Sequence, residues 1–181
     1  MLKHFWDDKN GGFFFTSDDA ESLFVRQKEI YDGAIPSGNS IAMLNLLRLG
    51  RMTANSELDL KASQIARAFF NKIRQSPAEY TQLMIAVDFS VGPSYEVVIA
   101  GDIQGEDTKK MLHAIGGKFI PNKIVIFLPS GTDLSEIMSI APFTRSQPTI
   151  DNRATAYVCV NYHCKLPTTN INDMISLLNS R

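Results

Sequence analysis

The 181-residue sequence contains few residues of the kinds that mark specialised protein classes. It has two cysteines, Cys159 and Cys164, which are too few to staple a small secreted fold, so we expect a cytoplasmic protein with reduced, mostly buried thiols. Residues five positions apart in a continuous strand point to opposite faces, so a disulfide or a zinc pair would require the strand to end near Tyr162. Its 18 Lys and Arg residues are balanced by 19 Asp and Glu residues, so no basic field would attract nucleic acid or a membrane surface. No apolar run approaches the roughly 20 residues of a membrane span.

Histidine is also rare, and His4, His113 and His163 are scattered along the chain. Without a carboxylate–histidine spacing, the sequence predicts no metal site. The segment 101–108 follows a strand-like run, but it lacks the motif of a phosphate-binding loop, and its acidic residues would repel phosphate. We therefore expect no bound cofactor.

Three helical patterns are present in the first half. The segment that follows Ser37 is apolar on nearly every side up to Leu49, the segment 56–76 has a single apolar stripe, and the segment 78–90 has little polar surface. This alternation of inner, outer and inner helices is typical of concentric helical layers. We predict that residues 1–93 form part of an (α/α) toroid, with a short N-terminal hairpin around Gly11-Gly12.

The second half changes to the pattern of buried strands separated by helices. Strands are predicted near 95–101, 123–129 and 154–162, and a helix is predicted after each of them. Such alternation implies a small parallel three-stranded sheet with right-handed crossovers over residues 94–181. The predicted fold class is therefore mixed α and β.

The best candidate for a binding site is the charged cluster Arg26, Lys28, Glu29 and Asp32, which precedes an apolar helix. Arg26 or Lys28 would bind an anionic group or a sugar hydroxyl, and Glu29 or Asp32 would act as acid or base. The alternative is a structural network of ion pairs that fixes the loop before the helix. The sequence does not decide between them.

Other polar residues near this cluster also have two interpretations. Ser37 and Asn39 are either helix caps or ligand contacts. Asp7 or Asp8 would supply a second carboxylate for glycoside hydrolysis, or would simply form a turn before Gly11. No catalytic residue can be assigned.

Several motifs together resemble a known family. They include Gly11-Gly12-Phe13-Phe14, the run from Arg26 to Arg48 with Pro36-Ser37-Gly38-Asn39-Ser40 at its centre, and Ala156-Tyr157-Val158-Cys159 followed by Cys164. They resemble the C-terminal region of thioredoxin-domain-containing proteins of the YyaL-like and spermatogenesis-associated type. The resemblance implies an N-terminal thioredoxin-like domain, followed by helices similar to the six-hairpin toroids of sugar epimerases and glycosidases.

This resemblance gives the functional expectations. The chain would be a C-terminal fragment with a pocket for a sugar-like or other small polar ligand at the toroid mouth. The alternative is a non-catalytic interaction module that supports an absent thioredoxin domain. Because the inner helices of an incomplete toroid would be uncovered, we expect self-association, as a twofold dimer.

Overall fold

The computed structural model describes residues 1–21 and 24–179. The chain divides into two compact units: Met1–Gly50 with Asn55–Val91, and Arg51–Ala54 with Gly92–Arg181. Within the described ranges, every helix is too short or too polar to cross a lipid bilayer.

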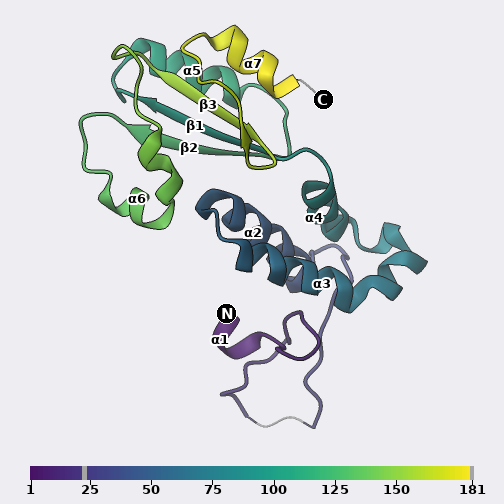
Figure 1. The fold of residues 1–181 in the computed structure, drawn as a ribbon. Coiled ribbons are helices and arrows are strands. Elements are labelled where there is room, and N and C mark those ends of the chain that lie inside the picture. The colour runs from purple at the N-terminus through teal and green to yellow at the C-terminus, as the bar shows by residue number, and fades with distance from the viewer. Residues whose placement is uncertain (22–23, 180–181) are drawn as a thin grey trace. The chain divides into compact units, whose positions relative to one another are not determined.

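The first unit is helical. In chain order it contains α1 (Leu2–Phe5), α2 (Gly38–Thr53), α3 (Ser56–Gln75), a 3-10 turn η1 (Pro77–Glu79) and α4 (Thr81–Val91), as Figure 1 shows. The last residues of α2 belong to the second unit. The cap of α2 is Ser37, whose Oγ accepts a hydrogen bond from the N–H of Ser40 at 3.1 Å. The cap of α3 is Asn55, whose side chain accepts a hydrogen bond from the N–H of Glu57 at 3.0 Å.

The helices of the first unit differ in burial, as the sequence patterns indicate. Half of the residues of α2 are buried, with Met43 and Leu47 among its interior side chains. The longer α3 buries only Ala62, Ile65 and Phe69, as expected for a half-exposed helix. The third helix was predicted to be interior, but α4 is only partly buried. One stripe of its side chains is buried, whereas Ile85 and Val91 are exposed.

A tight turn leads the N-terminal segment back along itself. Trp6 and Phe13 form an antiparallel bridge, and the N–H of Asp7 donates to the carbonyl oxygen of Gly12 at 2.9 Å. Gly11 and Gly12 have φ angles of 73° and 81°, a region that glycine enters without steric cost. The Trp6 ring is buried edge-on against Phe13, with centroids 5.0 Å apart, so it belongs to the core.

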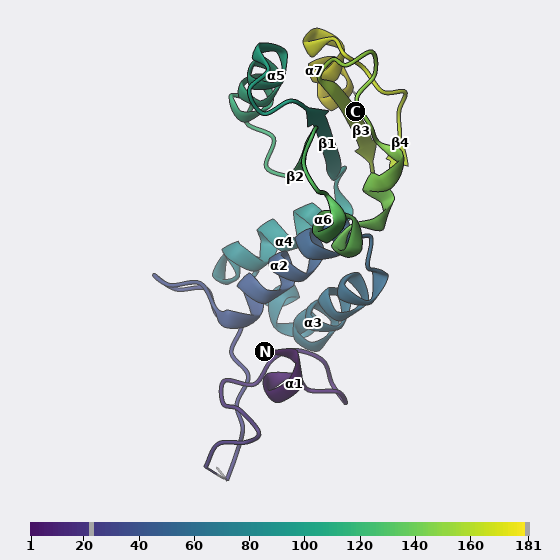
Figure 2. The same cartoon turned by 90° about the vertical axis from the view of Figure 1, so that its left-hand side faces the viewer.

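The second unit is built on a sheet. Its elements are β1 (Tyr95–Gly101), α5 (Glu106–Gly116), β2 (Lys123–Pro129), α6 (Ser135–Ile140), a 3-10 turn η2 (Pro142–Ser146), β3 (Thr155–Val160), β4 (His163–Cys164) and α7 (Ile171–Asn179). β1 is buried along its whole length because both faces of the sheet are covered. Figures 1 and 2 show α5 and α7 on one face and α6 on the other.

The prediction of a parallel three-stranded sheet is wrong. The described sheet has four strands in the order β2-β1-β3-β4; β1 and β2 are parallel, but β3 runs antiparallel to β1 and β4 antiparallel to β3. A helix between two strands suggested a crossover to a parallel strand, but α6 is short and η2 and a turn at 150–153 follow it before β3 begins. The turn into β4 cannot be predicted from the sequence, because Asn161-Tyr162 lacks the glycine usual in such turns.

Candidate functional site

Asp32 connects the first turns of two helices. Its Oδ1 accepts a hydrogen bond from the N–H of Ser37 at 2.9 Å, and its Oδ2 accepts one from the N–H of Leu83 at 3.0 Å. Ser37 precedes α2 and Leu83 lies in the first turn of α4. One buried carboxylate therefore satisfies backbone donors at both helix N-termini, where a negative charge is favoured.

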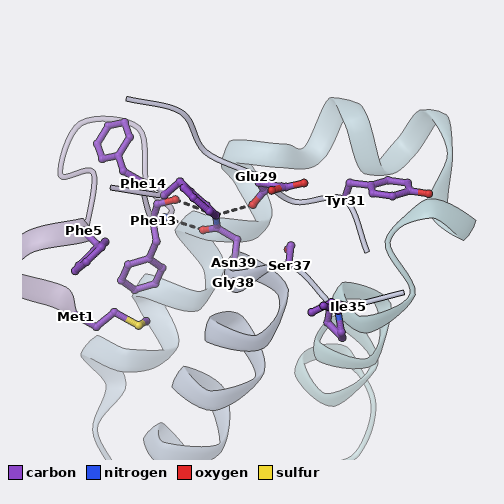
Figure 3. Close-up of a pocket in the computed structure, with 12 residues that line it drawn as sticks. Met1, Phe5, Phe13, Phe14, Glu29, Tyr31, Ile35, Ser37, Gly38 and Asn39 are labelled. Carbon is purple, nitrogen blue, oxygen red and sulfur yellow. Dashed lines mark hydrogen bonds between the residues drawn. The ribbon is translucent and has the colours of Figure 1, made fainter. Parts of the chain in front are cut away.

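Asn39 is a second buried residue whose side chain holds separate segments of the backbone together. Its Nδ2 donates to the carbonyl oxygens of Phe13 at 2.9 Å and Glu29 at 2.8 Å, and its Oδ1 accepts from the N–H of Phe13 at 2.7 Å. Figure 3 shows this side chain reaching from the start of α2 to both segments. Both its donor hydrogens and its acceptor serve the protein's own backbone.

Lys28 and Asp7 form a largely buried pair across the N-terminal turn. The Lys28 Nζ lies 2.5 Å from Asp7 Oδ2 and donates to the carbonyl oxygen of Gly11. Asp7 Oδ1 also accepts hydrogen bonds from the N–H groups of Lys9 and Asn10. Burial alone would raise the pKa of Asp7, but the hydrogen bonds from Lys28 and the turn outweigh it and hold the pKa well below its ordinary value.

Arg26 ties the loop to the N-terminal segment. Its Nη2 donates to the carbonyl oxygens of His4 at 3.1 Å and Thr16 at 2.7 Å. Its guanidinium carbon lies 4.1 Å from the centroid of the Phe14 ring, a cation–π contact. Arg26, Lys28, Asp32, Asn39 and Asp7 thus all make the intramolecular contacts expected of a network that fixes the loop.

The carboxylate of Glu29 is different. Its side chain is exposed, and within the described ranges it has no hydrogen-bond or ion-pair partner. It lies at the edge of a pocket of about 470 Å³, which is within the range of small-ligand sites. The pocket is lined by Met1, Phe5, Phe13, Phe14, Phe15, Glu29, Tyr31, Ile35, Pro36, Ser37, Gly38 and Asn39 (Figure 3).

A second hollow of about 420 Å³ adjoins the first. Phe15, Glu29 and Tyr31 line both hollows, and Lys28 and Lys72 line only the second. The chain around Glu29 therefore separates an aromatic pocket from a more polar one. A ligand in the first pocket would find rings to pack against and one free carboxylate as a hydrogen-bond acceptor.

The comparisons with known proteins concern the whole chain. The sequence matches no protein-family model. It is 33% identical to spermatogenesis-associated protein 20 of Homo sapiens and 32% identical to the protein of that name from Mus musculus, in each case over 177 residues, 97% of this chain. It is also 28% identical to an uncharacterised Caenorhabditis elegans protein over 176 residues.

These similarities confirm the resemblance to the spermatogenesis-associated type. The chain spans 22% of the length of the two mammalian proteins and 23% of the nematode protein. The thioredoxin-like domain and the toroid implied by the resemblance stay predictions.

The expectation of two free thiols is wrong. Cys159 and Cys164 form a disulfide, with their Cα atoms 3.8 Å apart. In a continuous strand, residues five positions apart point to opposite faces, but β3 ends at Val160 and the chain reverses through Asn161-Tyr162. This reversal places Cys159 directly opposite Cys164 in the register of β3 and β4.

The structure also brings together an exposed cluster that the sequence did not indicate. His4 Nδ1 lies 2.8 Å from Asp18 and 3.4 Å from Asp19. Spacings of 14 and 15 residues along an irregular segment give no periodic signal by which the three could be recognised. The contacts are those of a surface histidine between two carboxylates.

Proposed function

We propose that the first unit binds a small sugar-like or other polar ligand in the pocket beside Glu29. The observation that carries this proposal is a carboxylate with no partner in the described chain, at the edge of an otherwise aromatic pocket of about 470 Å³. Sugars have an apolar C–H face that packs on aromatic rings and hydroxyl groups that donate to carboxylates. Phe14, Phe15 and Tyr31 would supply the rings and Glu29 the acceptor.

The pocket favours binding over turnover. Glycoside hydrolysis generally uses two carboxyl groups on opposite sides of the scissile bond. Glu29 is the one acidic side chain among the residues found to line the pocket, and Asp7, the predicted second carboxylate, is paired with Lys28. The proposed role is therefore that of a binding element within a longer protein of the thioredoxin-domain-containing type, with α2, α3 and α4 as helices of its (α/α) toroid.

A ligand titration tests this role. Neutral mono- and disaccharides would be screened by saturation-transfer NMR, and any binder titrated calorimetrically against the wild type, Glu29→Ala and Glu57→Ala. Glu57 is a matched control, because it is exposed on α3 and does not line the pocket. We expect binding to be weaker by at least about tenfold for Glu29→Ala, since a hydrogen bond to a charged group contributes roughly 1.5–3 kcal/mol, and unchanged for Glu57→Ala. No binding by the wild type at millimolar sugar, or equal loss in both variants, would contradict the proposal.

A second candidate is a non-catalytic interaction module that associates with its own copies. The observation that favours it is the exposure of large apolar side chains on the two helices predicted to be interior. Val91 is 78% exposed and Ile85 47% exposed on α4, and Leu49 is 48% exposed on α2. Large exposed apolar patches are more often interfaces than free surface, and we infer that these side chains contribute to one.

A further inference from the structure

The disulfide between Cys159 and Cys164 joins one buried and one exposed residue. Cys159 is 4% exposed on β3, whereas Cys164 is exposed on β4, a strand of two residues. The N–H of Lys165 donates to the carbonyl oxygen of Val158 at 2.9 Å, so the cysteines occupy the next, non-hydrogen-bonded pair of the ladder. The two Cα atoms of such a pair come closest together, and Cys164 is the exposed member that an external thiol can approach.

The turn that closes this hairpin has an unfavourable backbone. Asn161 and Tyr162 have φ angles of 50° and 67°, a left-handed conformation that is uncommon for a bulky residue such as tyrosine. Glu96 and Arg51 compensate for it: Glu96 Oε2 accepts a hydrogen bond from the N–H of Tyr162 at 3.0 Å, and the Arg51 guanidinium carbon lies 4.1 Å from the Tyr162 ring centroid. These contacts hold the hairpin closed independently of the S–S bond.

A small pocket lies against the disulfide. Its volume is about 130 Å³, and it is lined by Arg51, Ala54, Glu96, Phe143, Cys159, Tyr162 and Cys164. Arg51 is the cationic side chain among these lining residues, and its Nη1 lies 3.8 Å from Glu96 Oε1. A cationic side chain beside a cysteine favours the thiolate, which is the leaving group when a disulfide is opened.

From this arrangement we propose that Cys159 and Cys164 form a reversible thiol–disulfide exchange site that accepts electrons from a dithiol. A ring closed by residues only five positions apart restricts the unfolded chain less than a long one, so this bond stabilises the fold less than a disulfide between distant residues would. A bond that is accessible, contributes less to stability than a long-range disulfide and lies on a hairpin held by other contacts is suited to open and close in the folded protein.

The exchange proceeds in two balanced steps. A thiolate of the dithiol attacks the exposed Cys164 sulfur; a new S–S bond forms to Cys164 as the bond to Cys159 breaks, and the electron pair leaves with Cys159 as a thiolate beside Arg51. The second thiolate of the dithiol then attacks the other dithiol sulfur, which is bonded to Cys164 in this mixed disulfide, and the Cys164 thiolate leaves. The dithiol is oxidised to a cyclic disulfide, and the protein gains two electrons and, once its thiolates take up protons from solvent, two thiols.

The first test uses the wild-type chain and needs no variant to fold. The protein would be equilibrated in glutathione buffers over a wide range of reduced-to-oxidised ratios, and its thiols alkylated and counted by mass spectrometry. We expect the oxidised and reduced forms to interconvert with circular dichroism unchanged, and Cys164 of the reduced form to be alkylated at least tenfold faster than Cys159. A disulfide that opens only in denaturant, or thiols that never pair, would overturn the proposal.

The second test concerns the direction of attack and the role of Arg51. Cys159→Ser should accumulate a mixed disulfide with glutathione on Cys164, at least tenfold faster than Cys164→Ser does on Cys159. With dithiothreitol as the dithiol, Arg51→Met should slow reduction of the protein disulfide several-fold, whereas Arg74→Met, an exposed arginine on α3, should not. Equal rates for the two cysteines, or equal effects of the two arginine variants, would count against the site as described.

Discussion

Asn39 pairs with Phe13 through both ends of its side-chain amide, donating to the carbonyl oxygen at 2.9 Å and accepting from the N–H at 2.7 Å. A backbone in an adjacent strand would make the same two bonds, so the side chain replaces a strand partner for the aromatic segment. Asn39 thereby satisfies the backbone N–H and carbonyl groups of Phe13, so that this residue can be buried. In the described chain, the bridge to Trp6 is the one strand-like pairing that Phe13 makes.

Replacing Asn39 should therefore destabilise the first unit. Asn39→Asp keeps the shape of the side chain but removes both donor hydrogens, leaving the carbonyl oxygens of Phe13 and Glu29 without their partner. We expect the free energy of unfolding, measured by urea titration, to fall by about 2–3 kcal/mol. Asn55→Ala, which removes an exposed helix cap, should lower it by about 1 kcal/mol. Equal effects would argue against the proposed role of Asn39.

The pair formed by Asp7 and Lys28 should make stability depend on pH in acid. The pKa of Asp7 is lowered in the folded chain, so its contribution is fully present above its ordinary pKa of 3.8 and is lost as the pH falls toward the lower folded pKa. Urea unfolding of the wild type and Asp7→Asn should differ by about 1.5–3 kcal/mol at neutral pH and converge below pH ~4.

Asp8→Asn provides the matched control for this titration. Asp8 is the neighbouring residue and is exposed, so its removal should change the free energy of unfolding by less than about 0.5 kcal/mol. A difference between the wild type and Asp7→Asn that stays constant down to pH ~2 would contradict the assignment.

Glu96 should give a pH dependence of the opposite sign. Burial raises its pKa above the ordinary value of 4.5, although the Tyr162 N–H, the Arg51 charge and the Ser94 hydroxyl act in the other direction. Between the two pKa values the folded chain retains a proton that the unfolded chain has released. The stability of the wild type relative to Glu96→Gln should therefore fall as the pH rises from 4.5 through the folded pKa.

The measurement is again urea unfolding, now between mildly acidic and neutral pH. Glu106→Gln serves as a control, because Glu106 is an exposed residue of α5 whose only ion pair in the described chain is with Lys109. Its difference from the wild type should be small and nearly independent of pH. A wild type that gains stability relative to Glu96→Gln over this range would show that burial does not dominate at Glu96.

Self-association through α2 and α4 can be measured directly. If the exposed apolar side chains form an interface, light scattering coupled to size-exclusion chromatography should detect dimers of the wild type at tens of micromolar. A double variant, Ile85→Lys with Val91→Lys, should be monomeric because it would bury like charges against each other. Leu60→Lys, on the exposed face of α3, should still dimerise. A monomeric wild type would contradict this interaction.

The main helices and strands could be predicted from the sequence because they depend on local patterns. The apolar stripe of α3 and the buried run of β1 have the periods of their elements, and Ser37 has the chemistry of a helix cap. The direction of β3 could not be predicted in the same way. It depends on where the segment after β2 returns to the sheet, which side-chain periodicity does not encode.

The sequence indicates the loop from Arg26 to Asn39 by its density of polar residues, but the contacts of these residues could not be assigned. Whether the loop binds a ligand stays a prediction. However, charged residues that bind a ligand and charged residues that pair with each other inside the protein can have the same sequence pattern. The distinction depends on partners distant in sequence, such as Asp7 for Lys28 and Leu83 for Asp32. The disulfide could not be predicted for a different reason: it depends on a turn at Asn161-Tyr162, which is not a common turn sequence.

The carboxylate of Asp32 couples the opening of the segment before α2 to the fraying of α4. Because it accepts from Ser37 with one oxygen and from Leu83 with the other, the segment before α2 cannot move away without releasing the first turn of α4. Opening of the loop and fraying of a helix 51 positions further along the chain then become one cooperative event. The amide hydrogens of Ser37 and Leu83 should accordingly exchange with solvent through a shared opening, at rates set by the same free energy.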